Sequence, residues 1–203
     1  MLLILLFSSA IQAQTLSMTV GRVSDHIITS REVHIQALME KALYGGEKTF
    51  KLDPLDSKNF FGEVNDTILE RALATEAKSF DVAHLDEKDV RETEAKVVKI
   101  LGNNPVWKQL EPQTPEWKGL LERKLKAKQF VKFRKESSQL PVTDAEAKRY
   151  FEENHLKFGN LPFDNFKDNI KAFLTRTQVD RRLKDWYEVI KAKYNAKNFL
   201  AEL

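Results

Sequence analysis

The chain has 203 residues, of which 42% are hydrophobic and 31% charged, so it is long and apolar enough to fold around one sizeable core or two small ones. Its 33 basic and 30 acidic residues leave a formal net charge of +3, which excludes a strong long-range field and names no partner. The absence of cysteine excludes disulfides, thiol catalysis and thiolate metal sites, and seven glycines and six prolines are too few for a turn-rich all-β fold. We therefore expect a mainly α protein.

The first 13 residues, MLLILLFSSAIQA, are uncharged and mostly aliphatic. They fit a secretory signal peptide, residues 1–13, with Ile11 and Ala13 at the minus-three and minus-one positions before cleavage at Gln14. The run is much shorter than the ~20 residues that span a bilayer, which disfavours a membrane anchor. No Lys or Arg precedes the run, and a buried N-terminal helix is the alternative.

Two short segments rich in β-branched residues come next, Thr19–Val23 and Ile27–Thr29, and they predict a minimal β-hairpin. Thr29 and Glu32 have the spacing of a capping box, which predicts that a helix follows at once and runs to Gly45-Gly46. Because two strands alone are marginally stable, we expect the hairpin to pack against helices elsewhere in the chain.

The middle of the chain predicts a loop over 47–62, an amphipathic helix over 64–80, and a third helix that begins after Asp86 and ends at Gly102. Two similar stretches, NPVWKQL and TPEWKGL, then present Asn104 and Thr114 as candidate N-caps, each followed by a proline.

The second stretch continues to about Ser137 as a strongly basic helix. We interpret its charges as a solvated face and predict no binding of nucleic acid, which an exported protein rarely meets. Transient contact with a membrane surface of anionic lipids, or with acidic client chains, stays open as an alternative.

A second capping box, Thr143 with Glu146, predicts another short helix. After the sequence GNLP, apolar residues recur at spacings of three and four from Phe163 to Tyr194, which predicts one long helix of about 45 Å. A helix of this length exceeds the width of a small domain, so we expect it to bridge parts of the molecule.

No arrangement typical of catalysis is present. The four histidines, His26, His34, His84 and His155, fall on four different predicted elements, and we interpret them as surface or hairpin-turn residues. The acidic pairs lie at helix starts or on solvated faces, and no glycine-rich phosphate loop occurs. The sequence therefore predicts no catalytic residues, no metal site and no cofactor.

Several motifs, in this order, resemble the SurA-type periplasmic chaperones. VGRVSDHIITSREV is similar to the hairpin that opens that family's fold, LPVTDAEAKRYFEENHLKF to the helix that leads into its isomerase domain, and the segment from Leu161 to Tyr194 to its C-terminal helix. Where the family carries one or more parvulin-type prolyl isomerase domains, this chain has only GNLP between Phe158 and Phe163. The resemblance implies one helical domain over 14–203. In it, a long C-terminal helix, 163–195, packs back on a SurA N-domain-like module, 14–158.

The same resemblance implies an ATP-independent periplasmic chaperone that binds unfolded outer-membrane or secreted polypeptides and has no isomerase activity. Large or flexible apolar residues beside loops suit promiscuous binding, although each of them can equally be core. The candidate peptide-binding residues are Met39, Leu43, Tyr44, Trp107 and Trp117. The alternative function is an export-pathway subunit that docks one dedicated protein partner, and the sequence leaves the oligomeric state open.

Overall fold

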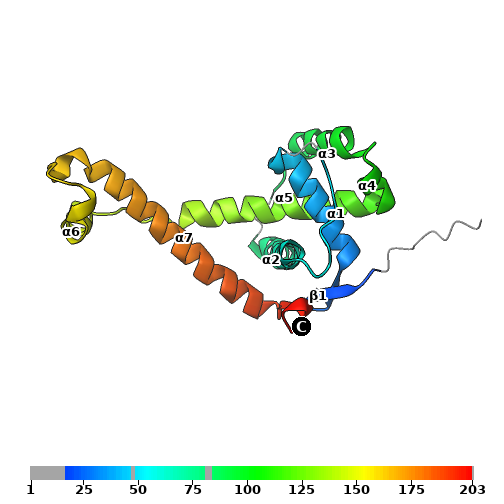
Figure 1. Ribbon diagram of the computed structural model, residues 1–203. Coiled ribbons are helices and arrows are strands. Elements are labelled where there is room, and N and C mark those ends of the chain that lie inside the picture. The colour runs from blue at the N-terminus through cyan, green and yellow to red at the C-terminus, as the bar shows by residue number, and fades with distance from the viewer. Residues whose placement is uncertain (1–16, 47–48, 81–83, 203) are drawn as a thin grey trace, which may run out of the picture.

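The computed structural model describes residues 17–46, 49–80 and 84–202, and the predicted signal peptide lies outside them (Figure 1). The mainly α prediction is confirmed, because the described residues form seven α-helices beside a small antiparallel sheet. None of these helices is long and apolar enough to cross a membrane. The helices are α1 Ser30–Glu40, α2 Lys58–Phe80, α3 Glu87–Leu101, α4 Pro105–Gln109, α5 Thr114–Ser137, α6 Asp144–Glu153 and α7 Lys167–Lys193.

The sheet joins the two ends of the described chain. Strands β1 Thr19–Val23 and β2 His26–Thr29 form the expected hairpin, and a strand that the sequence did not predict, β3 Lys197–Asn198, pairs with the other edge of β1. The backbone N–H of Ser24 in the hairpin turn also donates to the carbonyl oxygen of Tyr194 at 2.7 Å. In Figure 1 the blue strand β1 and the red C-terminal end therefore lie together.

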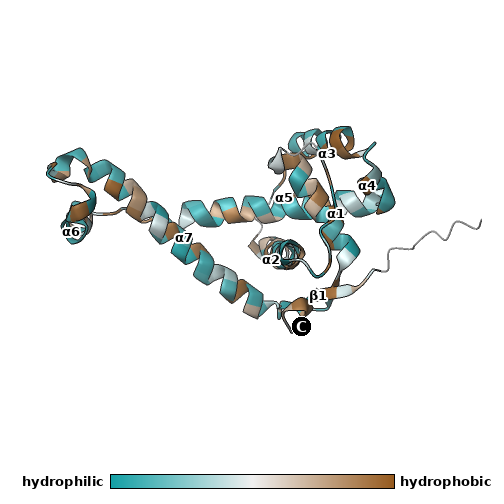
Figure 2. Ribbon diagram, viewed as in Figure 1, coloured by the Kyte–Doolittle hydropathy of each residue, from teal (hydrophilic) through white to brown (hydrophobic). Residues whose placement is uncertain are grey.

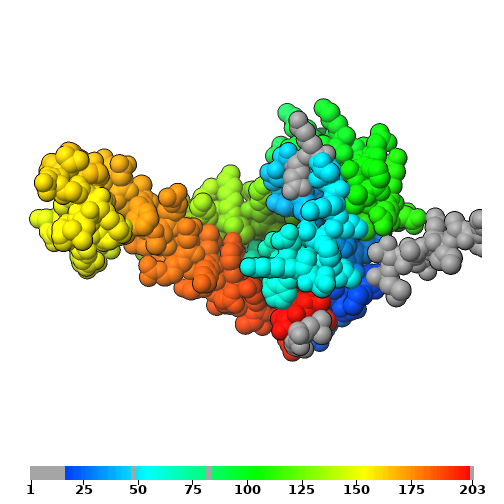
Figure 3. Space-filling model, viewed as in Figure 1, coloured from blue at the N-terminus to red at the C-terminus, as the bar shows by residue number. Residues whose placement is uncertain are grey.

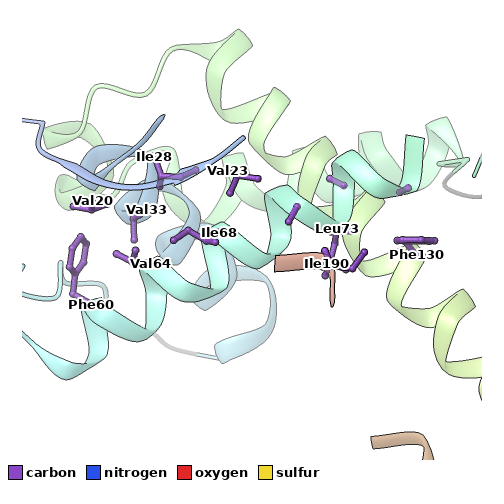
Figure 4. Close-up of a cluster of buried hydrophobic side chains, with 14 residues drawn as sticks. Val20, Val23, Ile28, Val33, Phe60, Val64, Ile68, Leu73, Phe130 and Ile190 are labelled. Carbon is purple, nitrogen blue, oxygen red and sulfur yellow. The ribbon is translucent and has the colours of Figure 1, made fainter. Parts of the chain in front are cut away.

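Helix α2 is the centre of the body of the molecule. Its buried residues Phe60, Val64 and Ile68 pack against the hairpin, and Leu73 lies nearer to Phe130 of α5 and Ile190 of α7 (Figure 4). A second buried cluster is built by the other face of α1 with α3, α4 and the first half of α5. A π-helical turn, η1 Lys41–Gly45, ends α1 and supplies buried residues to that second cluster.

Most helix starts follow the predicted capping residues. Asp86 accepts from the N–H of Lys88 at 2.7 Å, Asn104 accepts from the N–H of Val106, and Thr143 forms its complete capping box with Glu146. Two predicted starts are wrong. Helix α5 begins one residue earlier than expected, with Thr114 inside the helix, and α2 begins at Lys58, inside the predicted loop.

The predicted capping box of α1 is only half formed. Thr29 accepts from the N–H of Glu32 at 3.2 Å, but the Glu32 carboxylate turns away and pairs with Arg123 at 2.8 Å and with Arg71 at 3.4 Å. Burial would raise the pKa of Glu32, but the two guanidinium groups together hold the pKa below its usual value. The basic residues of α5 are therefore not all on a solvated face, since Arg123 joins α1, α2 and α5.

Helices α5, α6 and α7 build an arm that leaves the body (Figures 1 and 3). The expected long helix is present as α7, preceded by a separate 3₁₀ turn, η3 Phe163–Asn165. The C-terminal part of α7 packs on α2 and α5, and its N-terminal part packs on α6. We call the outer end of this arm, residues 140–173, the arm tip.

Candidate binding surfaces

The structure places the five predicted peptide-binding residues in two different settings. Met39, Leu43, Trp107 and Trp117 are buried in the second core cluster, where the two tryptophan rings meet edge to face at 6.5 Å. In this structure they present no surface to a partner, so their burial matches the alternative that they are core. Tyr44 is 46% exposed and is the one of the five that reaches the surface.

Tyr44 owes its position to the π-helical turn η1, which ends at Gly46 in a left-handed conformation with a φ of 65°. The Lys128 ammonium of α5 lies 3.5 Å from the centroid of the Tyr44 ring, a cation–π contact. Tyr44 and Lys128 together line two shallow hollows, of about 300 and 530 Å³.

A larger hollow of about 590 Å³ lies beside them, between α5 and the N-terminal half of α3. We call it the α3–α5 groove. The two helices are closed together at the other end of α3, where Lys118 pairs with Glu94 at 2.5 Å and Val97 is fully buried. Val90, nearer the start of α3, is only half-buried. The residues that line the groove are His84, Leu85, Asp86, Asp89 and Val90 on one side, and Leu125, Lys128, Gln129, Val131, Lys132 and Lys135 of α5 on the other.

The arm tip carries a second, more apolar surface. Six aromatic rings form one chain of contacts with centroid separations of 4.9–6.3 Å, contributed by Tyr150, Phe151, Phe158, Phe163, Phe166 and Phe173. None of these rings is fully buried, and the buried apolar residues of the arm tip are Val142, Ala147 and Ile170. Figure 2 shows hydrophobic residues on α6 and on the adjoining part of α7.

Two exposed leucines add to the apolar surface of the arm tip. Leu156 is 88% exposed and Leu161 54% exposed, and both lie in the connection between α6 and α7. The sequence pattern places several of these aromatic residues on helix faces and does not mark the tip as a site. The available signal was their density, six rings between residues 150 and 173 around the sequence GNLP.

Three charged side chains, Lys41, Asp53 and Glu63, form a clasp in the body. The Lys41 ammonium donates to Asp53 at 2.7 Å and to Glu63 at 2.9 Å. The hydrogen bond from Lys41 is the main reason that the pKa of Asp53 falls to about 2, whereas burial raises the pKa of Glu63. Because the lysine and the carboxylates bind one another, we interpret the clasp as structural: it fastens the segment before α2 to η1 and α2.

His34 lies close to this clasp, and its prediction as a surface or turn residue is wrong. Its ring is buried and lies 4.8 Å from the ring of Phe60, and burial lowers its pKa. His26 starts β2, and His84 and His155 are exposed as expected. Within the described ranges, no three His, Asp or Glu side chains are placed to hold a metal ion.

Comparisons with protein-family models, with curated proteins and with solved structures found no match to this chain. The resemblance of its motifs to the SurA-type chaperones therefore stays a prediction. The described structure is a helical body with two exposed surfaces of different character, the charged α3–α5 groove and the aromatic arm tip.

Proposed function

We propose that this protein is an ATP-independent chaperone of the SurA type, which holds unfolded outer-membrane or secreted polypeptides in the periplasm without prolyl isomerase activity. The observation that supports this most is the arm tip, where aromatic rings and two exposed leucines form an apolar surface away from the body. Contiguous exposed apolar surface on a folded protein is typical of a site that binds another polypeptide.

The physical mechanism is reversible burial of client side chains against the rings of the arm tip. Each Å² of apolar surface removed from water contributes about 25 cal/mol, so a contact of ~300 Å² contributes roughly 7 kcal/mol before ordering costs are subtracted. Those costs are of similar size, which makes the binding weak and reversible. A client then leaves by burying the same side chains in its own core, and no nucleotide is needed.

The anchoring of α7 in the body supports this function, because a binding tip needs a fixed base. Buried Glu76 of α2 accepts hydrogen bonds from the Lys193 ammonium and the Tyr194 hydroxyl, both at 2.6 Å, at the C-terminal end of α7. Burial, together with the hydrogen bond to Glu76, raises the pKa of Tyr194 to about 12. The tyrosine therefore stays a donor over the whole physiological pH range.

Light scattering tests the proposal directly. A chemically unfolded outer-membrane β-barrel protein is diluted out of denaturant into the mature chain, beginning at Gln14, without ATP. We expect near-stoichiometric amounts of the chain to suppress aggregation. We also expect the double variant Leu156→Ser with Leu161→Ser to lose most of this suppression, because it removes exposed apolar surface from the tip.

The matched control is Val98→Ser with Val189→Ser, which removes two exposed apolar side chains from α3 and α7 outside the arm tip. This variant should suppress aggregation as the wild type does. A wild-type chain that is helical by circular dichroism but does not suppress aggregation would contradict the chaperone proposal. Equal activity of the tip variant and the control would contradict the assignment of the tip.

The second candidate is an export-pathway subunit that docks one dedicated partner, and the charged α3–α5 groove favours it. Basic residues of α5 and acidic residues at the start of α3 line this groove, and such a charge pattern suits one complementary surface better than a broad range of unfolded chains. A single stable complex recovered by affinity capture from the periplasm, with no effect on aggregation, is the result expected for this candidate.

A further inference from the structure

The smaller of the two hollows beside Tyr44, about 300 Å³ in volume, has an apolar floor between α2 and α5. We call it the α2–α5 hollow. Leu69 and Leu73 are one turn apart on α2, and Ala127 and Val131 are one turn apart on α5. All four belong to the buried cluster around α2 or pack against it, and Leu69 and Val131 are only half-buried. The floor is therefore a single apolar surface that is partly open to solvent.

One carboxylate at the rim of the α2–α5 hollow has no partner. The Lys124 ammonium binds Glu70 at 2.7 Å and Glu40 at 3.0 Å, so these three charges are used. Asp66 lies one turn before Glu70 on the same face of α2, and among the described residues its side chain forms no hydrogen bond and no ion pair. Its carboxylate is partly withdrawn from water, which raises its pKa. The Lys124 ammonium opposes this shift and the two neighbouring carboxylates add to it, so a further cation would be favoured beside Asp66.

The other charged residue of the rim decides how such a cation lies. Lys128 is held over the Tyr44 ring, and its ammonium repels a second positive charge at that end of the hollow. Helices α2 and α5 run in the same direction here, because Glu70 meets Lys124 and, further along both helices, the ring of Phe80 meets that of Phe130 at 5.7 Å. Asp66 therefore lies before the Glu70–Lys124 pair and Lys128 after it. A ligand that fits has its positive head at Asp66 and an apolar part across the floor.

The side chains of arginine and lysine have this form, because a chain of methylene groups carries their charge. A volume of about 300 Å³ is at the lower end of the range for ligand pockets and suits one side chain. Room for the residues that flank it is present, since the 530 Å³ hollow and the α3–α5 groove also share Lys128 and continue along α5.

We infer that the α2–α5 hollow is a subsite for one basic side chain, arginine or lysine, of a partner polypeptide. The stem of that side chain covers Leu69 and Val131, and its charged head reaches Asp66. The flanking residues of the partner lie over the adjoining hollows. This inference goes beyond the proposed chaperone function and stands on a different surface from the arm tip.

Titration of the mature chain with short capped peptides, followed by nuclear magnetic resonance, tests this. The peptides differ only at a central position between two leucines, which is arginine, its neutral isostere citrulline, or glutamate. We expect the arginine peptide to bind about fivefold more tightly than the citrulline peptide, with a smaller difference at high salt. The largest changes in amide shifts should fall in residues 66–73 of α2 and 124–131 of α5.

Two variants of Asp66 sharpen the test. Asp66→Asn should bind the arginine peptide about fivefold more weakly than the wild type does, and the citrulline peptide as before. Asp66→Lys should prefer the glutamate peptide to the arginine peptide, and such a gain of binding cannot come from misfolding. The control Asp180→Asn removes an exposed carboxylate of α7 and should keep the wild-type preference.

Three results would overturn the inference. The first is wild-type protein that binds the arginine and citrulline peptides equally, and the second is a preference for arginine that persists in Asp66→Asn. The third is binding of butylguanidinium, a free analogue of the arginine side chain, as tight as that of the peptide, which would assign the hollow to small cations. The tip variant Leu156→Ser with Leu161→Ser should keep the preference for arginine, so a failure here and a failure of the chaperone proposal are distinguishable.

Discussion

Gly21 in β1 is the residue whose identity the fold restricts most clearly. A Cβ atom at this position would lie 2.9 Å from the backbone carbonyl oxygen of Lys197 in β3 and 2.8 Å from the Cδ1 atom of Ile68 in α2. Both distances are shorter than real Cβ contacts, and the carbonyl oxygen cannot rotate away as a side chain can. Glycine therefore allows the C-terminal strand to pair with the hairpin.

We predict that Gly21→Ala lowers the free energy of unfolding by about 1–3 kcal/mol, the usual effect of overpacking. Urea denaturation followed by circular dichroism measures it. The control is Gly119→Ala in α5, where a Cβ would meet nothing within 4 Å and where alanine favours the helix. Equal stability of Gly21→Ala and wild type would show that β3 does not depend on this close approach.

The capping residues show how far the sequence alone predicts structure at this scale. Asp86, Asn104 and Thr143 were identified correctly because a cap depends on residues within one turn. Glu32 was assigned to a capping box on the same local grounds, yet its carboxylate binds Arg123 and Arg71. Those two partners are distant in the sequence, and no local rule contains them.

Among the elements, the segment before α2 depends on pH through its clasp. Asp53 in this segment faces Lys41 of η1 and Asn59 and Glu63 of α2, with His34 of α1 close by. The pKa of Asp53 is lowered from 3.8 to about 2, so its contribution to stability is present above about pH 4 and is lost as the pH falls toward 2. The pKa of His34 is also lowered, so its protonation likewise reduces the stability of the fold as the pH falls below about 6.5. The pKa of Glu63 is raised, so its protonation favours the folded state as the pH falls.

We predict that Asp53→Asn is less stable than wild type by about 1–2 kcal/mol at pH 6 and that this difference disappears toward pH 2. Comparing the two proteins removes the contributions that they share. Denaturation in urea across this pH range measures the difference. Asp180→Asn, at an exposed site on α7, should show no such difference, and a gap between Asp53→Asn and wild type that stays constant with pH would contradict the clasp.

Element boundaries were predictable where a local signal marks them. The hairpin, the long α7 and the end of α3 follow from residue patterns, whereas β3 consists of only two residues and exists because β1 is beside it. The early start of α2 at Lys58 was missed because its first turn lies in a stretch that reads as a loop. The N–H of Phe60 donates to the Ser57 hydroxyl there, a cap that was not predicted from the sequence.

The molecule as a whole is a well-packed body with a lightly packed arm. The body holds two large buried clusters, and the arm tip rests on Val142, Ala147 and Ile170. The sequence contains enough apolar residues for these cores, but local patterns do not predict which of them contact one another. For that reason Met39, Leu43, Trp107 and Trp117 were candidate surface residues and proved to be core.

We predict that backbone amides in α6 exchange with deuterium at least about tenfold faster than those in the middle of α2, because the tip has few buried contacts to hold it closed. Hydrogen exchange followed by mass spectrometry resolves the two regions. Ile170→Ala should accelerate exchange in α6 and leave α2 unchanged. Equal protection of α6 and α2 in the wild type would show that tip and body open as one unit.

Site-specific photo-crosslinking shows whether the arm tip holds the client. A photoreactive amino acid is placed at Leu156, or at Val98 on the body as the reference, and each protein is illuminated with an unfolded outer-membrane β-barrel protein. We expect crosslinks from position 156 that disappear once the client has folded, and few from position 98. Crosslinks that are equal at both positions, or absent from the tip, would contradict it.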